Sequence, residues 1–228
     1  MATSGTYTFT LDITDIIEDA YERIGIEARS GYDYRTARRS LDMLLLEWQN
    51  RGLNLWTIQQ ADQVLTAGVA QYTLSSEKLD IIEAVARSSS GVNQNDFTLE
   101  RISVSQYAHY VNKNTRGRPT QFWVDRQPQA VTLNLWPVPE DSTYTLHYWY
   151  MTQIEDTGKP GSNTIDVPTR FIPALVAGLA YNLALKTPKS FQSAPILKEV
   201  YEEQWTLASD SAREKASLWL KPSTAYSL

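Results

Sequence analysis

Two amphipathic segments at the start of the chain and two at its end enclose about a hundred residues with the alternating pattern of short strands. In the first pair, residues 12–25 and 33–51, apolar residues recur at three- and four-residue spacing. The second pair covers residues 168–186 and 193–218. Because each such helix must bury a stripe, the two pairs are expected to share a core, while the strands between them pack separately.

This layout predicts an α+β protein: a discontinuous antiparallel helical bundle with an inserted antiparallel β-sandwich-like domain. Residues 1–56 and 166–228 are the two predicted parts of the helical domain, the second with a C-terminal tail, and residues 57–165 are the predicted β domain. The third helix has a bulky side and a small side, so we expect it to be packed on both. The last helix has little apolar surface beyond Ala208 and is expected to dock on another subunit.

Within the predicted β domain, Gly68 lies between two strand-like runs, residues 61–66 and 69–74, which predicts a hairpin. The alternating runs near the end of this domain, at residues 121–125, 130–136 and 144–151, are interpreted as half-buried antiparallel sheet. Further strands are predicted at residues 81–87, 97–102, 121–125, 130–136 and 144–151, with a short helix at residues 103–110.

Composition excludes several classes of protein. The chain of 228 residues has no cysteine, which removes disulfides and thiolate chemistry and favours a reducing compartment. A net charge of −5 argues against a protein that coats nucleic acid. Residues 1–10 lack the pattern of a signal peptide, and the most apolar stretch, residues 171–185, falls short of the ~20 residues needed to cross a bilayer. We interpret that stretch as a buried core helix.

Catalytic and metal-binding patterns are missing from the sequence. His109 and His147 lie in no ligand spacing with acidic neighbours, and the alternation around His147 predicts an exposed or rim side chain. The serines before Gly91 lack the context of a nucleophile elbow, and the glycines at 158 and 161 lack the spacing of a phosphate-binding loop. We therefore expect no enzyme activity, no metal and no cofactor.

Two surface features leave alternatives open. Lys113, Arg116 and Arg118 form a basic cluster in a loop, and such a cluster is a solvated surface, a protein interface or a nucleic-acid contact. The chain also has seven Trp and thirteen Tyr. Large cores, protein interfaces and carbohydrate-binding platforms each explain so many aromatic residues. The aromatic residues of the predicted strands that are candidates for stacking on sugars are Trp123, Trp136, Tyr148, Trp149 and Tyr150.

The helical segments resemble those of short-tailed phage head-to-tail adaptor proteins, the tail accessory or tail tubular protein A-like group. The residues that carry the resemblance are DIIEDAYERIG at 15–25, ARRSLDMLLLEW at 37–48 and the Arg51-Gly52 pair. In that family a first helix ending in Ile-Gly leads to a second ending in Trp and Gly, and the chain returns through an Ala-rich helix and a long charged one. Residues 174–186 and 195–218 are similar to that return.

The resemblance implies a structural adaptor of the virion, made in the host cytoplasm and placed at the head-tail interface. Such an adaptor forms a homo-oligomeric ring, usually a dodecamer, beneath the portal protein, extends the DNA channel and provides a docking platform for the tail nozzle or tail tube protein. Non-specific contact with packaged DNA is then possible, and no membrane is involved. Lys113, Arg116 and Arg118 become candidates for subunit or channel contact, and the candidates for portal docking are Trp219, Leu220, Tyr226 and Leu228.

The alternative function is a carbohydrate- or receptor-binding β-sandwich module of a tail structure. This alternative requires an exposed, coplanar row of the strand tryptophans and tyrosines. The two hypotheses therefore differ in where these rings should lie.

Overall fold

The computed structural model describes residues 9, 11–52, 55–89, 91–158 and 164–212. These residues divide into two compact units: Leu41–Val167, and the described residues on either side of that range. The first contains the strands, and the second contains α1, the first turns of α2, α4 and α5. The domain boundaries expected near residues 56 and 166 stay a prediction.

Helix α1 (Ile13–Arg23) begins and ends where the sequence predicts. The Asp12 carboxylate accepts hydrogen bonds from the backbone amides of Thr14 (2.7 Å) and Asp15 (2.9 Å). The Asp15 side chain in turn accepts from the Asp12 amide at 3.2 Å, which completes a capping box. Gly25 follows the helix with φ +73°, a left-handed conformation that glycine adopts without strain.

Helix α2 (Gly31–Asn50) begins two residues earlier than predicted. Ser30 is the reason, because its hydroxyl accepts from the Asp33 amide (3.3 Å) while the Asp33 carboxylate accepts from the Ser30 amide (3.0 Å). The first turns of α2 are joined to α1 by two tyrosine hydroxyls. Tyr34 donates to Glu18 at 2.6 Å, and Tyr21 donates to the Asp33 carbonyl at 3.1 Å.

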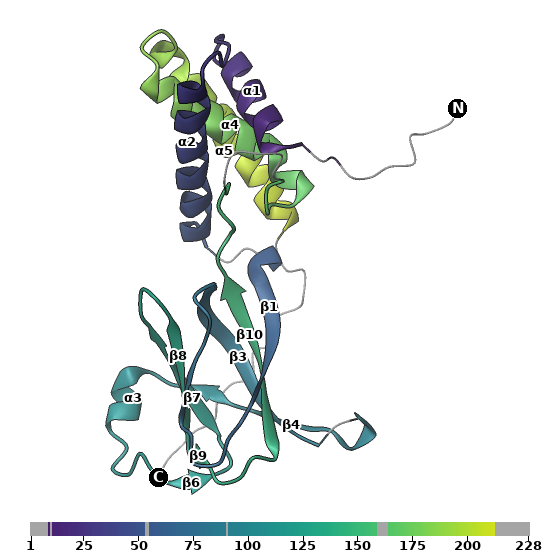
Figure 1. Cartoon of the computed structure of the whole chain (residues 1–228), viewed down its shortest axis with the longest axis vertical. Coiled ribbons are helices and arrows are strands. Elements are labelled where there is room, and N and C mark those ends of the chain that lie inside the picture. Colours follow the sequence, from purple (N-terminus) through teal and green to yellow (C-terminus); the bar gives the residue numbers. More distant parts are fainter. Residues whose placement is uncertain (1–8, 10, 53–54, 90, 159–163, 213–228) are drawn as a thin grey trace, which may run out of the picture. The chain divides into compact units, whose positions relative to one another are not determined.

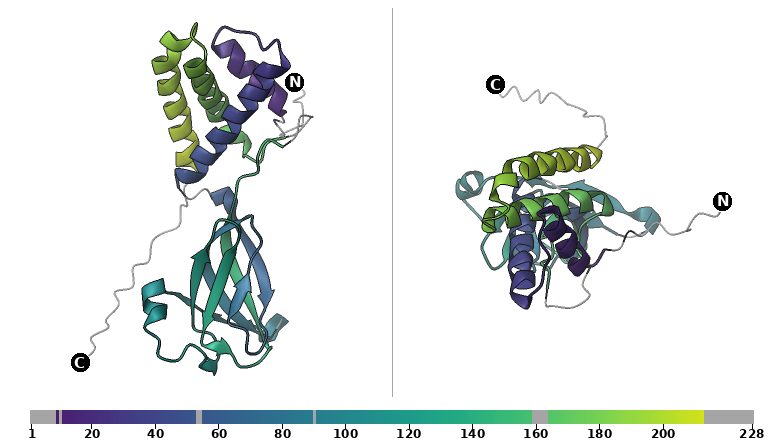
Figure 2. Two further views of the ribbon diagram at one scale, coloured as in Figure 1. Left: turned by 60° about the vertical axis from the view of Figure 1, so that its left-hand side comes forward. Right: turned by 90° about the horizontal axis from the view of Figure 1, so that it is seen from above.

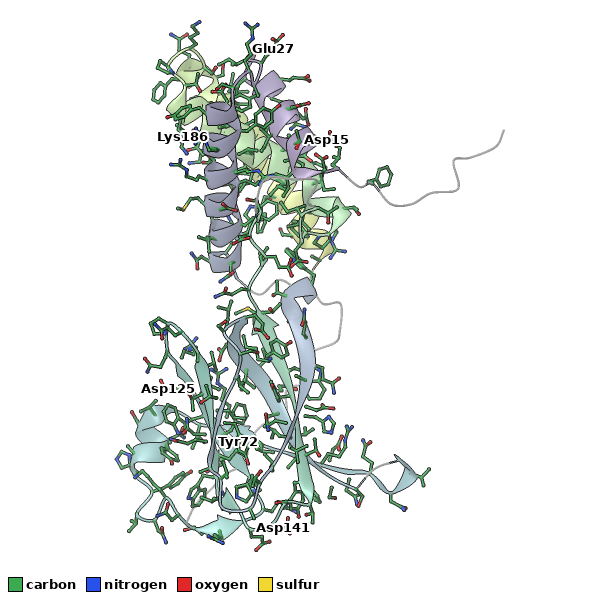
Figure 3. The ribbon with its side chains drawn as sticks, viewed as in Figure 1. Asp15, Glu27, Tyr72, Asp125, Asp141 and Lys186 are labelled. Carbon is green, nitrogen blue, oxygen red and sulfur yellow. The ribbon has the colours of Figure 1, made fainter. Side chains whose placement is uncertain are left out.

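Helix α4 (Ile172–Lys186) is the centre of the helical unit. Ten of its fifteen residues are buried, which confirms that it is packed on more than one side. Helix α1 packs against it, as does α5 (Ala194–Ser211), so helices from the two ends of the chain pack together as predicted (Figure 1, Figure 2). Lys186, labelled in Figure 3, donates to Ser40 of α2 at 2.7 Å. The predicted extension of the last helix to residue 218 lies mostly outside the described residues.

The β unit contains two four-stranded sheets and a separate pair of short strands. The first sheet has the order β1-β10-β3-β4 and the second has the order β2-β8-β7-β5, while β6 pairs with β9. The elements in chain order are the 3-10 turn Leu55–Thr57, β1 (Ile58–Val64), β2 (Gln71–Thr73), β3 (Lys78–Ser88), the 3-10 turn Gly91–Asn93, β4 (Asn95–Thr98), β5 (Glu100–Arg101), α3 (Val104–Ala108), β6 (Arg116–Gly117), β7 (Gln121–Arg126), β8 (Val131–Trp136), β9 (Val138–Pro139) and β10 (Tyr144–Thr152).

Side chains from both four-stranded sheets form one hydrophobic core. Tyr72, labelled in Figure 3, is 8% exposed, and its hydroxyl oxygen accepts a hydrogen bond from the Thr66 backbone amide at 2.8 Å. The buried residues of this core are Leu65, Tyr72, Leu74, Ile81, Ala84, Ala86, Leu99, Phe122, Val131, Leu133, Leu135, Leu146, Tyr148 and Tyr150.

The predicted hairpin around Gly68 is wrong. Gly68 does turn the chain, with φ +78°, but β1 pairs with β10 in one sheet and β2 pairs with β8 in the other. Leu65 is fully buried between these strands, so the chain passes through the core as it changes sheets. The local pattern identified two strands correctly, but it contains no information about their partners.

The predicted strand at residues 97–102 is likewise divided between the two sheets. β4 pairs antiparallel with β3, whereas β5 pairs parallel with β7. The change occurs at Leu99, which is 4% exposed and donates its amide to the Ala84 carbonyl at 3.0 Å. The short strands β6 and β9 also pair in parallel. The sequence predicted antiparallel pairing throughout, and that prediction is wrong for these two pairs of strands.

A row of charged and polar side chains crosses the first sheet on the face opposite to its core residues. Asp62 of β1 lies opposite His147 of β10, and Arg87 of β3 lies opposite Asp96 of β4. Arg87 donates to both carboxylate oxygens of Asp96, at 2.7 and 2.8 Å, while His147 Nδ1 lies against the Asp62 carboxylate. His147 is 7% exposed, so the predicted exposed position is wrong: side chains on neighbouring strands cover it.

The hydrogen bonds from Arg87 hold the pKa of Asp96 below its ordinary range, and they raise the pKa of Arg87. Because the pKa of Asp96 is lower in the folded state than in the unfolded state, the pair contributes stability above roughly pH 4, and this is lost as the pH falls through the folded-state pKa.

The substitution Arg87→Gln should therefore raise the pKa of Asp96 toward its ordinary value, because the two charge-assisted hydrogen bonds are removed. Titration of the carboxyl carbon by NMR measures this shift. Arg101→Gln, which removes a pair with Asp80 instead, is the control and should leave Asp96 unchanged. An unaltered Asp96 titration in the Arg87→Gln protein would contradict this role.

The substitution Trp48→Asp should unfold the part of the chain around the second half of α2, and Leu45→Asp should do the same. Both side chains are buried, at 0% and 3% exposure. An unpaired buried charge costs several kcal/mol, against a total stability of ~5–15 kcal/mol. Thermal melting followed by circular dichroism checks the effect. Leu46→Asp is the matched control because Leu46 is 52% exposed. A normal melting profile for Trp48→Asp would show that the assignment of Trp48 to the buried face of α2 is wrong.

Candidate interaction surfaces

The three predicted basic residues lie in one connecting segment but point to different neighbours. Lys113 donates to the carbonyls of Ala108 (3.3 Å) and Tyr110 (3.2 Å), just beyond the end of α3. The Arg116 guanidinium lies against Gly68, where an added Cβ would be 3.5 Å from it. All three side chains remain exposed.

Arg118 lies over the ring of Phe97, with its guanidinium carbon 4.1 Å from the ring centroid. Each of the three cations therefore already has a neighbour within the β unit. Because their charges still face solvent, they can attract a negatively charged partner over a long distance. Their role in subunit or channel contact stays a prediction.

The aromatic side chains of the second sheet are covered from within the chain. Tyr110, after α3, stacks on Trp136 with ring centroids 4.1 Å apart, and Tyr107 of α3 lies 5.5 Å from Trp123. The Trp136 indole also donates to the Asn112 carbonyl at 3.2 Å. These contacts fix α3 on the sheet by aromatic packing.

The remaining strand aromatics are also used in packing. Tyr148 and Tyr150 belong to the shared core, at 3% and 7% exposure, and Trp149 is half-buried. The five rings proposed as a sugar platform therefore do not form an exposed row. The observation required for a carbohydrate-binding module is not met by these residues.

A cleft in the β unit has a volume of about 550 Å³ and an acidic lining. Its carboxylates belong to Asp42, Glu77, Glu155, Asp156 and Asp166. Asp42 accepts from the Thr157 amide at 3.0 Å. The hydrogen bond from Ser75, followed by contacts with Lys78, lowers the pKa of Glu77. The Asp156 carboxylate accepts from the Gly158 amide at 2.8 Å, so three of the five carboxylates are held by groups of the chain itself.

Among the described residues, no group of three or more histidine, aspartate and glutamate side chains could hold a metal ion. His109 contacts the Ser105 carbonyl through Nδ1 at 2.6 Å, and His147 Nδ1 lies against the Asp62 carboxylate. Ser88 ends β3 and Ser89 lies in a turn with φ +61°, far from the strand-to-helix geometry of a nucleophile elbow.

The helices carry surface features that the sequence analysis missed. α5 exposes Ile196 (67%), Val200 (37%) and Leu207 (61%) along one side. The signal was present in their spacing of four and seven residues, but the buried stripe with Tyr201 and Ala208 accounted for the helix by itself. On α2, Tyr32, Met43 and Leu46 are exposed in a similar way.

The four residues proposed for portal docking, Trp219, Leu220, Tyr226 and Leu228, lie outside the described residues. Within the described part of the chain, no helix combines the length and the apolar character that crossing a membrane requires.

One comparison with known proteins finds a family match, and another finds no matching protein. The sequence model of the SU10 adaptor protein family matches residues 2–219, which is nearly the whole chain. A search of curated proteins finds no match. The match includes both helical segments and all the strands described above, so it confirms the resemblance seen in the helices. The chain belongs to the SU10 adaptor protein family, whose members are structural head-to-tail adaptors of phages and not enzymes.

Proposed function

We propose that the protein forms a ring, of twelve copies, beneath the portal protein of a phage and joins the head to the tail nozzle or tail tube. The observation that carries this proposal is the family match over residues 2–219. The ring extends the DNA channel from the portal, and the protein acts at the head-tail interface of the virion after synthesis in the host cytoplasm. This role needs no cofactor, because binding to the portal and to the tail involves no chemical reaction.

The arrangement of the chain supports a protein with two separate surfaces for two partners. Helices from both ends of the sequence pack together, and a β unit with its own core is inserted between them. We propose that residues 57–165 form an inserted sandwich-like domain in a discontinuous helical bundle formed by residues 1–56 and 166–228. One domain can then contact one neighbour while the other remains available to a second.

The C-terminal tail is the proposed portal anchor. Trp219, Leu220, Tyr226 and Leu228 supply apolar and aromatic side chains of the kind that dominate binding energy at interfaces. The described part of α5 ends at Ser211, and its last buried apolar residue is Ala208. A tail that follows such a helix gains most by burying its apolar groups on a partner.

The exposed cations Lys113, Arg116 and Arg118 are proposed to contact a neighbouring subunit or the DNA in the channel. Repetition in a ring would multiply three charges per chain into a positive band, although the free chain carries a net charge of −5. Contact with DNA would be non-specific and would weaken with added salt.

The ring itself is tested by measuring the mass of the purified protein, alone and mixed with its cognate portal, by native mass spectrometry and by electron microscopy. We expect closed rings of twelve copies on portal particles. A protein that stays monomeric on the portal, or that does not bind it, would refute the proposal.

Deletion of residues 219–228 should leave the fold unchanged and weaken portal binding, because the removed side chains are proposed to bury their apolar surface on the portal. Thermal melting checks the fold, and co-sedimentation with portal particles checks the binding. A Ser223→Ala, Ser227→Ala double variant keeps the apolar anchors and is the control. Undiminished binding of the truncated protein would remove the tail from the interface.

A further inference from the structure

The outward side of α2 carries a stripe of exposed residues with two unpaired positive charges. Tyr32, Arg35, Arg39 and Met43 follow one another at spacings of three or four residues, which places them on one face of the helix. Tyr32 and Met43 are each 66% exposed. Arg35 donates only to the Gly31 carbonyl of its own helix, at 3.2 Å, and neither arginine forms an ion pair with a described carboxylate.

The outward side of α5 carries a stripe with the same spacing and the opposite charge. Ile196, Glu199, Glu203 and Leu207 lie on one face, with Val200 beside them. Ile196 and Leu207 are 67% and 61% exposed. Neither Glu199 nor Glu203 has an ion-pair partner among the described residues.

Both stripes place two like charges one helical turn apart. Pairs of this kind destabilise a helix unless opposite charges approach them. In one stripe the pair is Arg35 and Arg39, and in the other it is Glu199 and Glu203, each flanked by exposed apolar side chains. The two stripes therefore complement each other in charge, in apolar ends and in spacing.

The two helices also begin at the same end of the helical unit. The connection before α2 and the connection before α5 are joined there by the Ser190 hydroxyl, which donates to the Ile24 carbonyl at 3.0 Å (Figure 1, Figure 2). Copies related by rotation about an axis directed from this end of the helical unit toward its other end would keep this shared sense of direction. A parallel alignment then places Tyr32 by Ile196, Arg35 by Glu199, Arg39 by Glu203 and Met43 by Leu207.

We propose that α5 of one copy packs in parallel along α2 of the next copy, and that this contact closes the ring. The inference rests on the proposed ring and identifies the surfaces that form it. It is a heterologous contact, because two different faces of the chain meet, and such contacts produce closed rings when the rotation closes. A cleft of about 400 Å³ beside Tyr32, lined also by Ile26 and Leu183, provides space for apolar side chains of the neighbour.

Charge reversal at one predicted pair tests the alignment. Arg39→Glu and Glu203→Arg should each reduce ring formation at least about tenfold, because like charges then meet at every interface. The double variant with both changes should restore rings. Arg39→Glu combined with Glu199→Arg is the matched control and should not restore them, since Glu199 faces Arg35 in this register. All measurements use the full chain, alone and mixed with portal particles.

The possible results separate this inference from the proposed ring. If the unaltered protein forms no ring, both proposals fail. If it forms rings that neither single variant weakens, only the α2–α5 contact is wrong. Rings that persist in variants with lost portal binding would assign the stripes to the portal and overturn the inference. Unchanged melting temperatures of the exposed-site variants show that folding is not the cause.

Cysteine cross-linking provides a second test, because the native chain has no cysteine. Met43→Cys and Leu207→Cys are introduced in separate, differently tagged chains, which are mixed and oxidised in the presence of portal. A disulfide-linked pair of the two chains is expected. Met43→Cys mixed with Ile196→Cys is the control: cross-linking there in place of the first pair would reverse the helix direction and refute the parallel contact.

Discussion

Burial of α4 on more than one side is the constraint on which the helical unit depends. This helix lies near the end of the sequence, yet α1, from the beginning, packs against it together with α5. A stretch as apolar as residues 171–185 cannot remain exposed in water, so the two ends of the chain must meet around it. The strands are consequently confined to a loop of chain that leaves the helical unit and returns to it.

The β unit is also held together by burial of apolar side chains, here between two sheets. Its strands change sheets twice over short distances, at Leu65 and at Leu99, and each change buries the leucine between the sheets. Of the five aromatic residues that first suggested a sugar platform, Tyr148 and Tyr150 belong to this core, Trp123 and Trp136 pack against Tyr107 and Tyr110, and Trp149 is half-buried. The surface of the β unit carries charged side chains such as Arg118 together with exposed valines such as Val92 and Val111.

The sequence allowed the helices to be predicted closely and the sheets only as separate strands. Helix ends are set by near neighbours, as in the capping box of Asp12 and Asp15, and such signals are visible in one sequence. Strand partners are set by contacts between distant residues, so the hairpin at Gly68 was wrong although its strands were found. Burial of His147 was missed for the same reason: its cover comes from neighbouring strands. The exposed stripe of α5 was missed because the helix already had one buried face.

The first and last strands of the β unit are neighbours. Ile58 at the start of β1 lies opposite Met151 near the end of β10, so the stranded part of the chain begins and ends at neighbouring positions of one ladder. An inserted part whose two junctions lie together places little geometric demand on the scaffold that carries it. Lengthening, shortening or exchanging the material beyond this junction leaves the spacing at the helices unchanged. The architecture thus allows the β unit to diversify while the packing of the helices around α4 stays the same.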